Sequence, residues 1–293
     1  MPPVAPVPVR HVSSTDGVTL AVHDLGGEGP PVLLCHPTGF LAMTWAPLAE
    51  ELAEAAHCWA LDFRGHGDSD APASGDYDWA RMADDVLAVA DDLGLRQARG
   101  AGHSMGGAAL VMAEQRRPGT FSRLWLYEPI IVPSAADGRP GGSPMAEAAR
   151  RRRPWFPDRE SAYDNFATKP PLDTLAPAAL RAYVDYGLRD VPGDVEGAVE
   201  LKCRPEVEAL VFDGGMAQPT FDHLGEVGCR VTVAASGDGG GPALFAPAIV
   251  DALPDAVLER HDELTHFGPM EDPAGMAARV RAALDLAQWV PPA

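Results

Sequence analysis

The amino-acid sequence predicts an α/β protein in which helices flank a mostly parallel β-sheet and one mostly helical segment is inserted. The first observation is a set of short apolar strands, such as Val-Leu-Leu-Cys at residues 32–35. Such strands are typical of parallel sheets, because both faces of these sheets are buried. The second observation is that the strands alternate with helix-like segments. The third is a change of rhythm between residues 130 and 228, where prolines and arginines cluster and no apolar strand is found.

The first third of the chain alternates between the two kinds of element. Residues 19–24 alternate like a half-buried strand, and the glycines and proline within residues 26–30 predict a turn. Residues 79–93 have the spacing of an amphipathic helix, whose aspartates we expect on a solvated face. The expected elements are strands at 19–24, 32–35 and 57–61, helices at 45–55 and 79–93, and a loop at 62–69.

The alternation continues from residue 97 and resumes after the inserted segment. The strand at 97–102 is only weakly indicated, because Arg99 and Gly100 interrupt its apolar character. The further expected elements are a helix at 108–115, a strand at 124–127, helical pieces at 144–153, 159–167, 177–186 and 205–212, strands at 230–235 and 257–260, and helices at 242–253 and 275–286. We therefore expect a core domain of residues 1–129 and 229–293. A cap, or lid, of residues 130–228 should lie over the carboxyl edge of the sheet, where ligands bind in such folds.

The composition limits the partners that the protein can have. The chain has 293 residues, of which 46% are apolar, enough for one large domain or one domain with an insertion. It carries 23 basic and 42 acidic residues, for a net charge of −19. Because nucleic acids and anionic membranes attract cationic surfaces, we expect neither as a partner. A small molecule is the expected substrate, and the oligomeric state stays open.

The cysteines and the N-terminus predict a cytoplasmic protein. None of the four cysteines forms a C-x-x-C pair, so we expect no zinc site. Cys35, Cys58 and Cys229 lie in or beside apolar segments, so we expect buried thiols there rather than disulfides. The first eight residues have neither the basic start nor the apolar run of a signal peptide, and no run of about 18 apolar residues predicts a membrane span. Lys169 and Lys202 are the only lysines, and alanine, glycine and proline abound, which is typical of a bacterial coding bias.

Residues 102–107 read Gly-His-Ser-Met-Gly-Gly, a G-x-S-x-G pattern. In a nucleophile elbow, a serine lies on a sharp and strained turn between a strand and a helix, where bulky neighbours would clash. Glycines two residues before and two residues after Ser104 avoid that clash, and a helix-like segment follows. The pattern predicts that Ser104 is a nucleophile.

A serine hydroxyl is a poor nucleophile unless a base removes its proton. In this architecture the chain order is serine, then acid, then histidine. His266 follows the last predicted strand, in a loop from which an imidazole can reach Ser104. We interpret His266 as the base. His261 is a weaker candidate because it lies at the end of that strand.

Two carboxylates are candidates for the acid that orients the imidazole. Asp238 follows the strand at 230–235, in the loop that is the commoner position of this acid, although the glycines around it would hold it loosely. Glu128 ends the strand at 124–127, and Pro129 fixes the backbone after it. The sequence leaves both open, and we expect the other residue to have a structural or pocket role.

An oxyanion hole requires two backbone N–H donors. One should be Met105, the residue after the nucleophile, at the N-terminus of its helix. The other should come from residues 36–40, His-Pro-Thr-Gly-Phe. The proline has no N–H, so Thr38 is the expected donor and Gly39 the second choice. We expect His36 to brace this loop rather than to act as a base.

Four motifs together resemble the α/β-hydrolase fold superfamily. They are Cys-His-Pro-Thr-Gly-Phe at 35–40, Asp-Phe-Arg-Gly-His-Gly-Asp-Ser at 62–69, Gly-His-Ser-Met-Gly-Gly at 102–107 and His-Phe-Gly-Pro at 266–269. The match covers nearly the whole chain outside the cap, in the right order. The resemblance implies an eight-stranded sheet, a cap and a Ser–His–acid hydrolase. The chain departs from the usual pattern in having His-Pro where His-Gly is common and in its ambiguous acid.

The substrate pocket should lie between the core and the cap. The pocket candidates are His36, Phe40, His103, Trp155 and Phe156. The other aromatic residues of the cap are Tyr163, Phe166, Tyr183 and Tyr186. They could line an apolar acyl or ring pocket as well, but we expect most of the cap's aromatic residues to form its core. The arginines at 150–153 have the chemistry to bind a substrate carboxylate or phosphate, but we favour the interpretation that they cap a helix C-terminus.

We therefore expect an enzyme that cleaves a carboxylic ester or lactone of a small to medium apolar substrate through an acyl-enzyme, with no cofactor or metal. Serine rather than aspartate at position 104 argues against the haloalkane dehalogenase and epoxide hydrolase branches of the superfamily, which need a carboxylate nucleophile. The alternatives are a thioesterase or a cyclase-type acyl transferase of natural-product biosynthesis, a cofactor-free perhydrolase, and a ligand-binding protein on a hydrolase scaffold. Labelling by a fluorophosphonate would distinguish the last of these.

Overall fold

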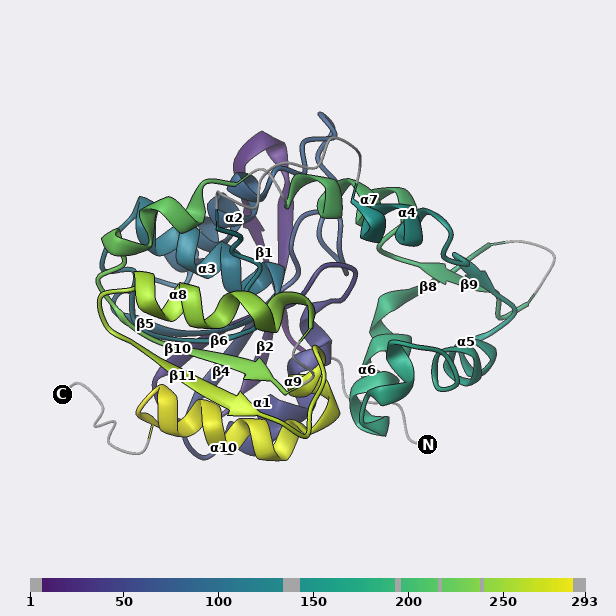
Figure 1. Cartoon of the computed structure of the whole chain (residues 1–293). Helices are drawn as coiled ribbons and strands as arrows, with labels where there is room; N and C mark the ends of the chain where they lie inside the picture. The colour runs from purple at the N-terminus through teal and green to yellow at the C-terminus, as the bar shows by residue number, and fades with distance from the viewer. Residues whose placement is uncertain (1–6, 134–142, 193–195, 216–217, 238–239, 287–293) are drawn as a thin grey trace.

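An eight-stranded sheet lies between layers of helices (Figure 1). The computed structural model describes residues 7–133, 143–192, 196–215, 218–237 and 240–286. The strand order is β1-β2-β4-β3-β5-β6-β10-β11, and all pairs except β1–β2 and β2–β4 are parallel. The strands are β1 (Val9–Ser13), β2 (Thr19–Gly26), β3 (Pro31–Cys35), β4 (His57–Leu61), β5 (Ala98–His103), β6 (Phe121–Tyr127), β10 (Arg230–Ser236) and β11 (Ala256–His261). The predicted class and the mostly parallel sheet are confirmed.

Helices cover both faces of the sheet (Figure 1). One face carries α2 (Trp79–Asp92), α3 (Met105–Arg116) and α8 (Ala246–Ala252), and the other carries α1 (Ala46–Leu52) and α10 (Pro273–Ala283). Successive side chains of a strand point to opposite faces. Accordingly, Leu33 of β3 packs in the core below α3, whereas Leu34 packs in the core below α1. Both faces of this strand are buried, which explains its wholly apolar sequence.

β5 forms despite the residues that weakened its prediction. A Cβ atom on Gly100 would lie 2.8 Å from the Leu124 side chain and 3.2 Å from that of Leu110. The missing side chain therefore lets α3 and β6 pack closely against this strand. The Arg99 Nε donates a hydrogen bond to the backbone oxygen of Leu284 at 2.8 Å, which satisfies the charged side chain at the edge of the core.

β1 was not predicted. It is an edge strand, and Val12 is its one buried residue. An edge strand with one buried side chain has no apolar run by which the sequence can reveal it.

The inserted segment is mostly helical, as predicted, but it also contains a small sheet. Its helices are α4 (Pro144–Arg150), α5 (Arg159–Phe166), α6 (Pro177–Gly187) and α7 (Pro205–Gly214). Three short strands pair antiparallel in the order β7-β9-β8, namely β7 (Trp155–Phe156), β8 (Leu188–Asp190) and β9 (Val199–Leu201). Strands of two or three residues carry no periodicity, so the sequence did not reveal this sheet. These elements lie to one side of the large sheet (Figure 1), and the cap boundaries at residues 130 and 228 stay a prediction.

The cysteines and the helices test two expectations from the composition. All four cysteines are free and buried. None of the helices that the structure describes combines the length and the apolar character needed to cross a bilayer.

Candidate active site

Ser104 lies at the junction of β5 and α3, where it precedes the first residue of the helix. Its φ of 55° and ψ of −116° are strained for a residue with a side chain. A Cβ atom on Gly102 would lie 2.7 Å from the Gly107 nitrogen, and one on Gly106 would lie 2.2 Å from the Cys35 carbonyl oxygen. Both obstacles are backbone atoms, which cannot rotate away, so this turn requires both glycines.

We expect Gly106→Ala to destabilise the fold, because the new Cβ atom must push the Cys35 carbonyl out of β3. Overpacking of this kind costs about 1–3 kcal/mol, and each kcal/mol lowers the Tm of a large domain by about 3 °C. Thermal unfolding followed by circular dichroism measures the loss. Gly225→Ala is the control, because nothing lies within 4 Å of a Cβ atom at Gly225. Equal Tm values for the two variants would show that the elbow tolerates a side chain at this position.

His266 and Glu128 are in direct contact. The Nδ1 of His266 lies 2.6 Å from Oε2 of Glu128, and the backbone N–H of Ser236 donates to Oε1 of the same carboxylate at 2.8 Å. Glu128 follows β6 directly, and its own N–H donates to the Ala234 oxygen of β10 at 2.8 Å. The glutamate is therefore fixed at the carboxyl edge of the sheet through both its backbone and its side chain.

Glu128 is held in its ionised form. Its side chain is 1% exposed, and this burial raises the pKa of the carboxyl. The hydrogen bonds from His266 and from the Ser236 N–H outweigh burial, so the pKa of Glu128 lies below its ordinary value. An ionised carboxylate beside Nδ1 favours the tautomer that carries the proton there. Asp238, the other candidate acid, lies outside the described residues.

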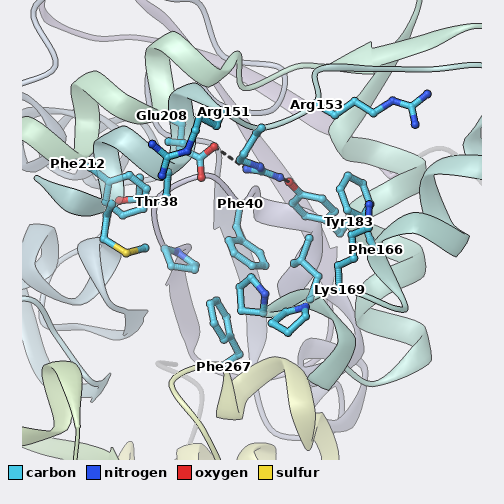
Figure 2. Close-up of a pocket in the computed structure, with 18 of the residues that line it drawn as sticks. Thr38, Phe40, Arg151, Arg153, Phe166, Lys169, Tyr183, Glu208, Phe212 and Phe267 are labelled. Atoms are coloured by element: carbon cyan, nitrogen blue, oxygen red, sulfur yellow. Dashed lines mark hydrogen bonds and ion pairs between the residues drawn. The ribbon is translucent and has the colours of Figure 1, made fainter.

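A cavity of about 490 Å³ opens at the carboxyl edge of the sheet (Figure 2). Ser104, His266 and Thr38 line it from the core, and Phe166 and Tyr183 line it from the inserted segment. Its volume is that of a site for a small organic molecule. The structure thus brings the predicted nucleophile and the predicted base to one cavity.

The expected oxyanion donors of the loop after β3 differ in the hydrogen bonds that they make to the described residues. Neither the Thr38 N–H nor the Met105 N–H has a hydrogen-bond partner among the described residues. The Gly39 N–H, in contrast, donates to the His66 Nε2 at 3.1 Å. Burial lowers the pKa of His66 to about 4, so the ring is neutral and accepts this bond. Gly39 is therefore not available as an oxyanion donor, which corrects that expectation, and His66 is a bracing residue that the sequence analysis missed.

His36 braces the same loop and does not line the cavity, contrary to its place among the pocket candidates. Its Nδ1 donates to the Pro37 oxygen at 2.8 Å, and its Nε2 accepts from the Phe63 N–H at 3.1 Å. Burial, reinforced by the neighbouring His66, lowers the pKa of His36 to about 3. With both nitrogens bound to backbone, this neutral ring has no nitrogen left for catalysis.

Two further pocket candidates also lie elsewhere. His103 is fully buried, with its ring centre 4.7 Å from that of His266. Trp155 is 38% exposed, because side chains alternate along β7 and its neighbour Phe156 takes the buried side. Of the five pocket candidates, Phe40 and Phe156 line the cavity.

His261, the weaker candidate for the base, is also turned away from the cavity. It is buried at the end of β11, and its Nε2 lies 2.7 Å from Glu259. It is not among the described residues that line the cavity.

The arginines at 150–153 do not act together as a helix cap. α4 ends at Arg150, which pairs with Asp213 at 2.8 Å, so the other three follow the helix. Arg152 turns inward and donates to the Glu208 carboxylate and to the Tyr183 hydroxyl, each at 2.6 Å. Burial works against its charge, but these two partners raise the pKa of Arg152 above its ordinary value. The sequence could not show this cluster, because its members come from three separate segments.

Known proteins resemble this chain in sequence and in fold. A family model described as alpha/beta hydrolase fold matches residues 30–194. The AB hydrolase superfamily protein YisY of Bacillus subtilis is 36% identical over 111 residues, which span 38% of this chain but only 41% of that relative. Haloalkane dehalogenase 2 of Mycobacterium tuberculosis is 27% identical over 261 residues, or 87% of each chain. The solved structure of the esterase RhEst1 from Rhodococcus sp. ECU1013 is similar in fold, with a TM-score of 0.72 and 23% identity over 96% of this chain and 99% of that one.

Proposed function

The chain belongs to the α/β-hydrolase fold family and is an enzyme of that family, and we propose that it is a serine hydrolase that cleaves carboxylic esters or lactones through an acyl-enzyme. The observation that carries this proposal is the arrangement of Ser104, His266 and Glu128. The serine lies on a strained elbow at the cavity, the imidazole lines the same cavity, and a buried carboxylate lies 2.6 Å from Nδ1 of that imidazole.

In the proposed reaction, each of these three residues has one task. Glu128 holds the proton on Nδ1 of His266, which leaves the lone pair of Nε2 to take the proton of the Ser104 hydroxyl. The serine oxygen attacks the substrate carbonyl, and the N–H groups of Thr38 and Met105 stabilise the oxyanion. His266 then returns the proton to the leaving alcohol. Water, activated by the same imidazole, releases the acyl group from Ser104.

The nucleophile favours acyl chemistry over the reaction of the dehalogenase relative. Displacement of a halide by a carboxylate gives an alkyl ester, which water can cleave at its carbonyl carbon. Displacement by Ser104 would instead give an alkyl ether, which water does not cleave, and the enzyme would be blocked after one turnover. A serine at this position therefore supports a substrate with a carbonyl group, in spite of the 27% identity to haloalkane dehalogenase 2.

A fluorophosphonate probe tests whether Ser104 is activated. We expect folded protein to be labelled once per chain, and intact-mass and peptide analysis should locate the label on Ser104. A reactive serine requires the neighbouring base, so His266→Gln should slow the labelling by about 10²-fold or more. Heat-denatured protein and Ser104→Ala are the controls and should remain unlabelled. A folded protein that does not react would favour a ligand-binding role and contradict the proposal.

Assays with different substrates distinguish an esterase from a thioesterase and from a perhydrolase. Matched oxygen esters and thioesters of one acyl chain separate an esterase from a thioesterase, and halogenation with peroxide and acetate reveals perhydrolysis. All three activities would use the same serine, histidine and carboxylate, so labelling alone does not separate them.

A further inference from the structure

The charged side chains that line the cavity are mostly cationic, whereas the chain as a whole is acidic. The whole chain has a net charge of −19. Apart from His266, however, the described residues that line the cavity include four cationic side chains, Arg151, Arg152, Arg153 and Lys169, and one carboxylate, Glu208. A concave wall of one sign attracts ligands of the opposite sign, most strongly where its other side chains are apolar. Phe40, Phe166 and Phe267 supply that apolar background.

Glu208 neutralises one of the four cations. Its carboxylate lies 2.6 Å from Arg152, and the side chains of this pair are 8% and 22% exposed. The Tyr183 hydroxyl accepts the second hydrogen bond from the same guanidinium. Glu208 also packs against the loop after β3, since a Cβ atom on Gly39 would lie 2.3 Å from its Oε1. The Arg152–Glu208 pair is thus a fixed part of the wall with little net charge.

A second cation is directed away from the cavity. The guanidinium of Arg153 lies over the Phe156 ring, 4.7 Å from its centre, and its Nε donates to the Trp155 oxygen. Figure 2 shows this side chain extending away from the other labelled residues.

Arg151 and Lys169 keep their charge available. Arg151 lies 3.6 Å from Glu147, but both side chains are largely exposed, at 71% and 66%, and such pairs are weak and easily exchanged. The Nζ of Lys169 donates to the Asn165 side-chain oxygen at 2.6 Å, and this neutral partner cancels no charge. Figure 2 shows Arg151 and Lys169 at separate places on the wall of the cavity.

We infer that the substrate carries a carboxylate, which the positive charge of Arg151 and Lys169 attracts to the cap side of the cavity while its scissile carbonyl lies at Ser104. The inference rests on the proposed function and narrows it, because it replaces the expected apolar substrate by an acid with an ester or lactone group. Charge-assisted hydrogen bonds from a guanidinium and an ammonium are suited to a carboxylate. The phenyl groups that line the same cavity would accept the hydrocarbon chain that joins the two ends of the substrate.

Two esters with the same number of acyl carbons test this inference. Mono-4-nitrophenyl adipate carries a free carboxylate, whereas 4-nitrophenyl hexanoate ends in a methyl group. We expect kcat/KM for the adipate ester to exceed that for the hexanoate ester by about 10-fold or more at low salt, and the ratio to fall in 0.5 M NaCl. Arg151→Gln and Lys169→Gln should each lower the ratio several-fold, and the double variant should bring it close to one.

Arg150→Gln is the matched control. Arg150 lies next to Arg151, but it pairs with Asp213 and is not part of the described cavity wall, so the ratio should stay within two-fold of that of the native enzyme. A ratio of one or less in the native enzyme would overturn the inference. So would a ratio that the double variant leaves unchanged.

A binding measurement keeps this test separate from the proposed function. Calorimetry with Ser104→Ala should detect adipate binding and much weaker binding of 1,6-hexanediol, without any turnover. Equal binding of the two would overturn the inference. Hydrolysis of the hexanoate ester that depends on Ser104, with no preference for the adipate ester, would refute the inference alone. A protein that hydrolyses neither ester and resists the fluorophosphonate would refute the proposed function, whatever the adipate result.

Discussion

Replacing Ser104 by alanine should lower kcat/KM for 4-nitrophenyl hexanoate by about 10⁴–10⁶-fold, because no acyl-enzyme can form without the hydroxyl. The residual rate would come from substrate binding and from the N–H groups of Thr38 and Met105, which the substitution leaves in place. Release of 4-nitrophenolate, followed spectrophotometrically, measures the change. The variant should fold normally, because the substitution removes one oxygen atom from a side chain for which no hydrogen-bond partner is found among the described residues.

Ser122→Ala provides the comparison for this result. Ser122 lies in β6, and its hydroxyl donates to the Ala98 oxygen, so its loss removes one hydrogen bond of the scaffold rather than a reacting group. We expect its kcat/KM to remain within about three-fold of the native value, because its contribution is one hydrogen bond. If Ser104→Ala retained activity like that of Ser122→Ala, Ser104 would not be the nucleophile and the proposed mechanism would be wrong.

The parts of the fold that were predicted correctly are those with a local cause. β3 is wholly apolar because it is buried on both faces, and Gly106 is a glycine because the Cys35 carbonyl leaves no room for a Cβ atom. Both causes act through the residue type at one position, so the sequence alone carries the information. The missed strands lack such a signal, since β1 exposes most of its side chains and β7 has two residues.

The candidate active site depends more than these elements of the fold on contacts between segments that are distant in the sequence. The roles of His36 and His66 follow from backbone groups at Phe63 and Gly39 that each ring nitrogen meets across the fold. The ion pair of Arg152 and Glu208 likewise joins segments that are 56 residues apart in the chain. The sequence analysis expected His36 to brace its loop. A histidine or an arginine looks the same in a sequence whether it braces a loop or faces a substrate, however, so the roles of His66 and Arg152 could not be assigned before the contacts were known.

The choice between the two candidate acids illustrates the same limit. Glu128 has a φ of 43°, which turns its side chain from the end of β6 toward His266. The pairing of β6 with β10 brings the Ser236 N–H to its other oxygen. Neither the unusual backbone conformation nor the pairing can be read from the residues around Glu128. The glycines around Asp238 indicated only that an acid there would be loosely held.

Replacing Glu128 by glutamine should lower kcat by about 10²–10⁴-fold while leaving the side-chain volume unchanged. The Ser236 N–H requires an acceptor, so the glutamine should keep its oxygen on that side and turn its NH₂ group toward His266. An amide donor facing Nδ1 favours the imidazole tautomer with the proton on Nε2. In that tautomer the base has no lone pair directed at Ser104, so the serine is no longer activated. Steady-state kinetics with 4-nitrophenyl hexanoate measure the loss, and fluorophosphonate labelling should slow in parallel.

Asp238→Asn distinguishes the two carboxylates in the same assay. If Glu128 alone orients His266, Asp238→Asn should change kcat by less than about three-fold, because the ionised carboxylate at Nδ1 is still present. The reverse pattern, with a loss of 10²-fold or more in Asp238→Asn and little change in Glu128→Gln, would assign the acid to Asp238. The 2.6 Å hydrogen bond between Glu128 and His266 would then have a structural role only. Because both substitutions preserve side-chain volume, a difference between them reports the loss of a charge at the imidazole rather than a change in packing.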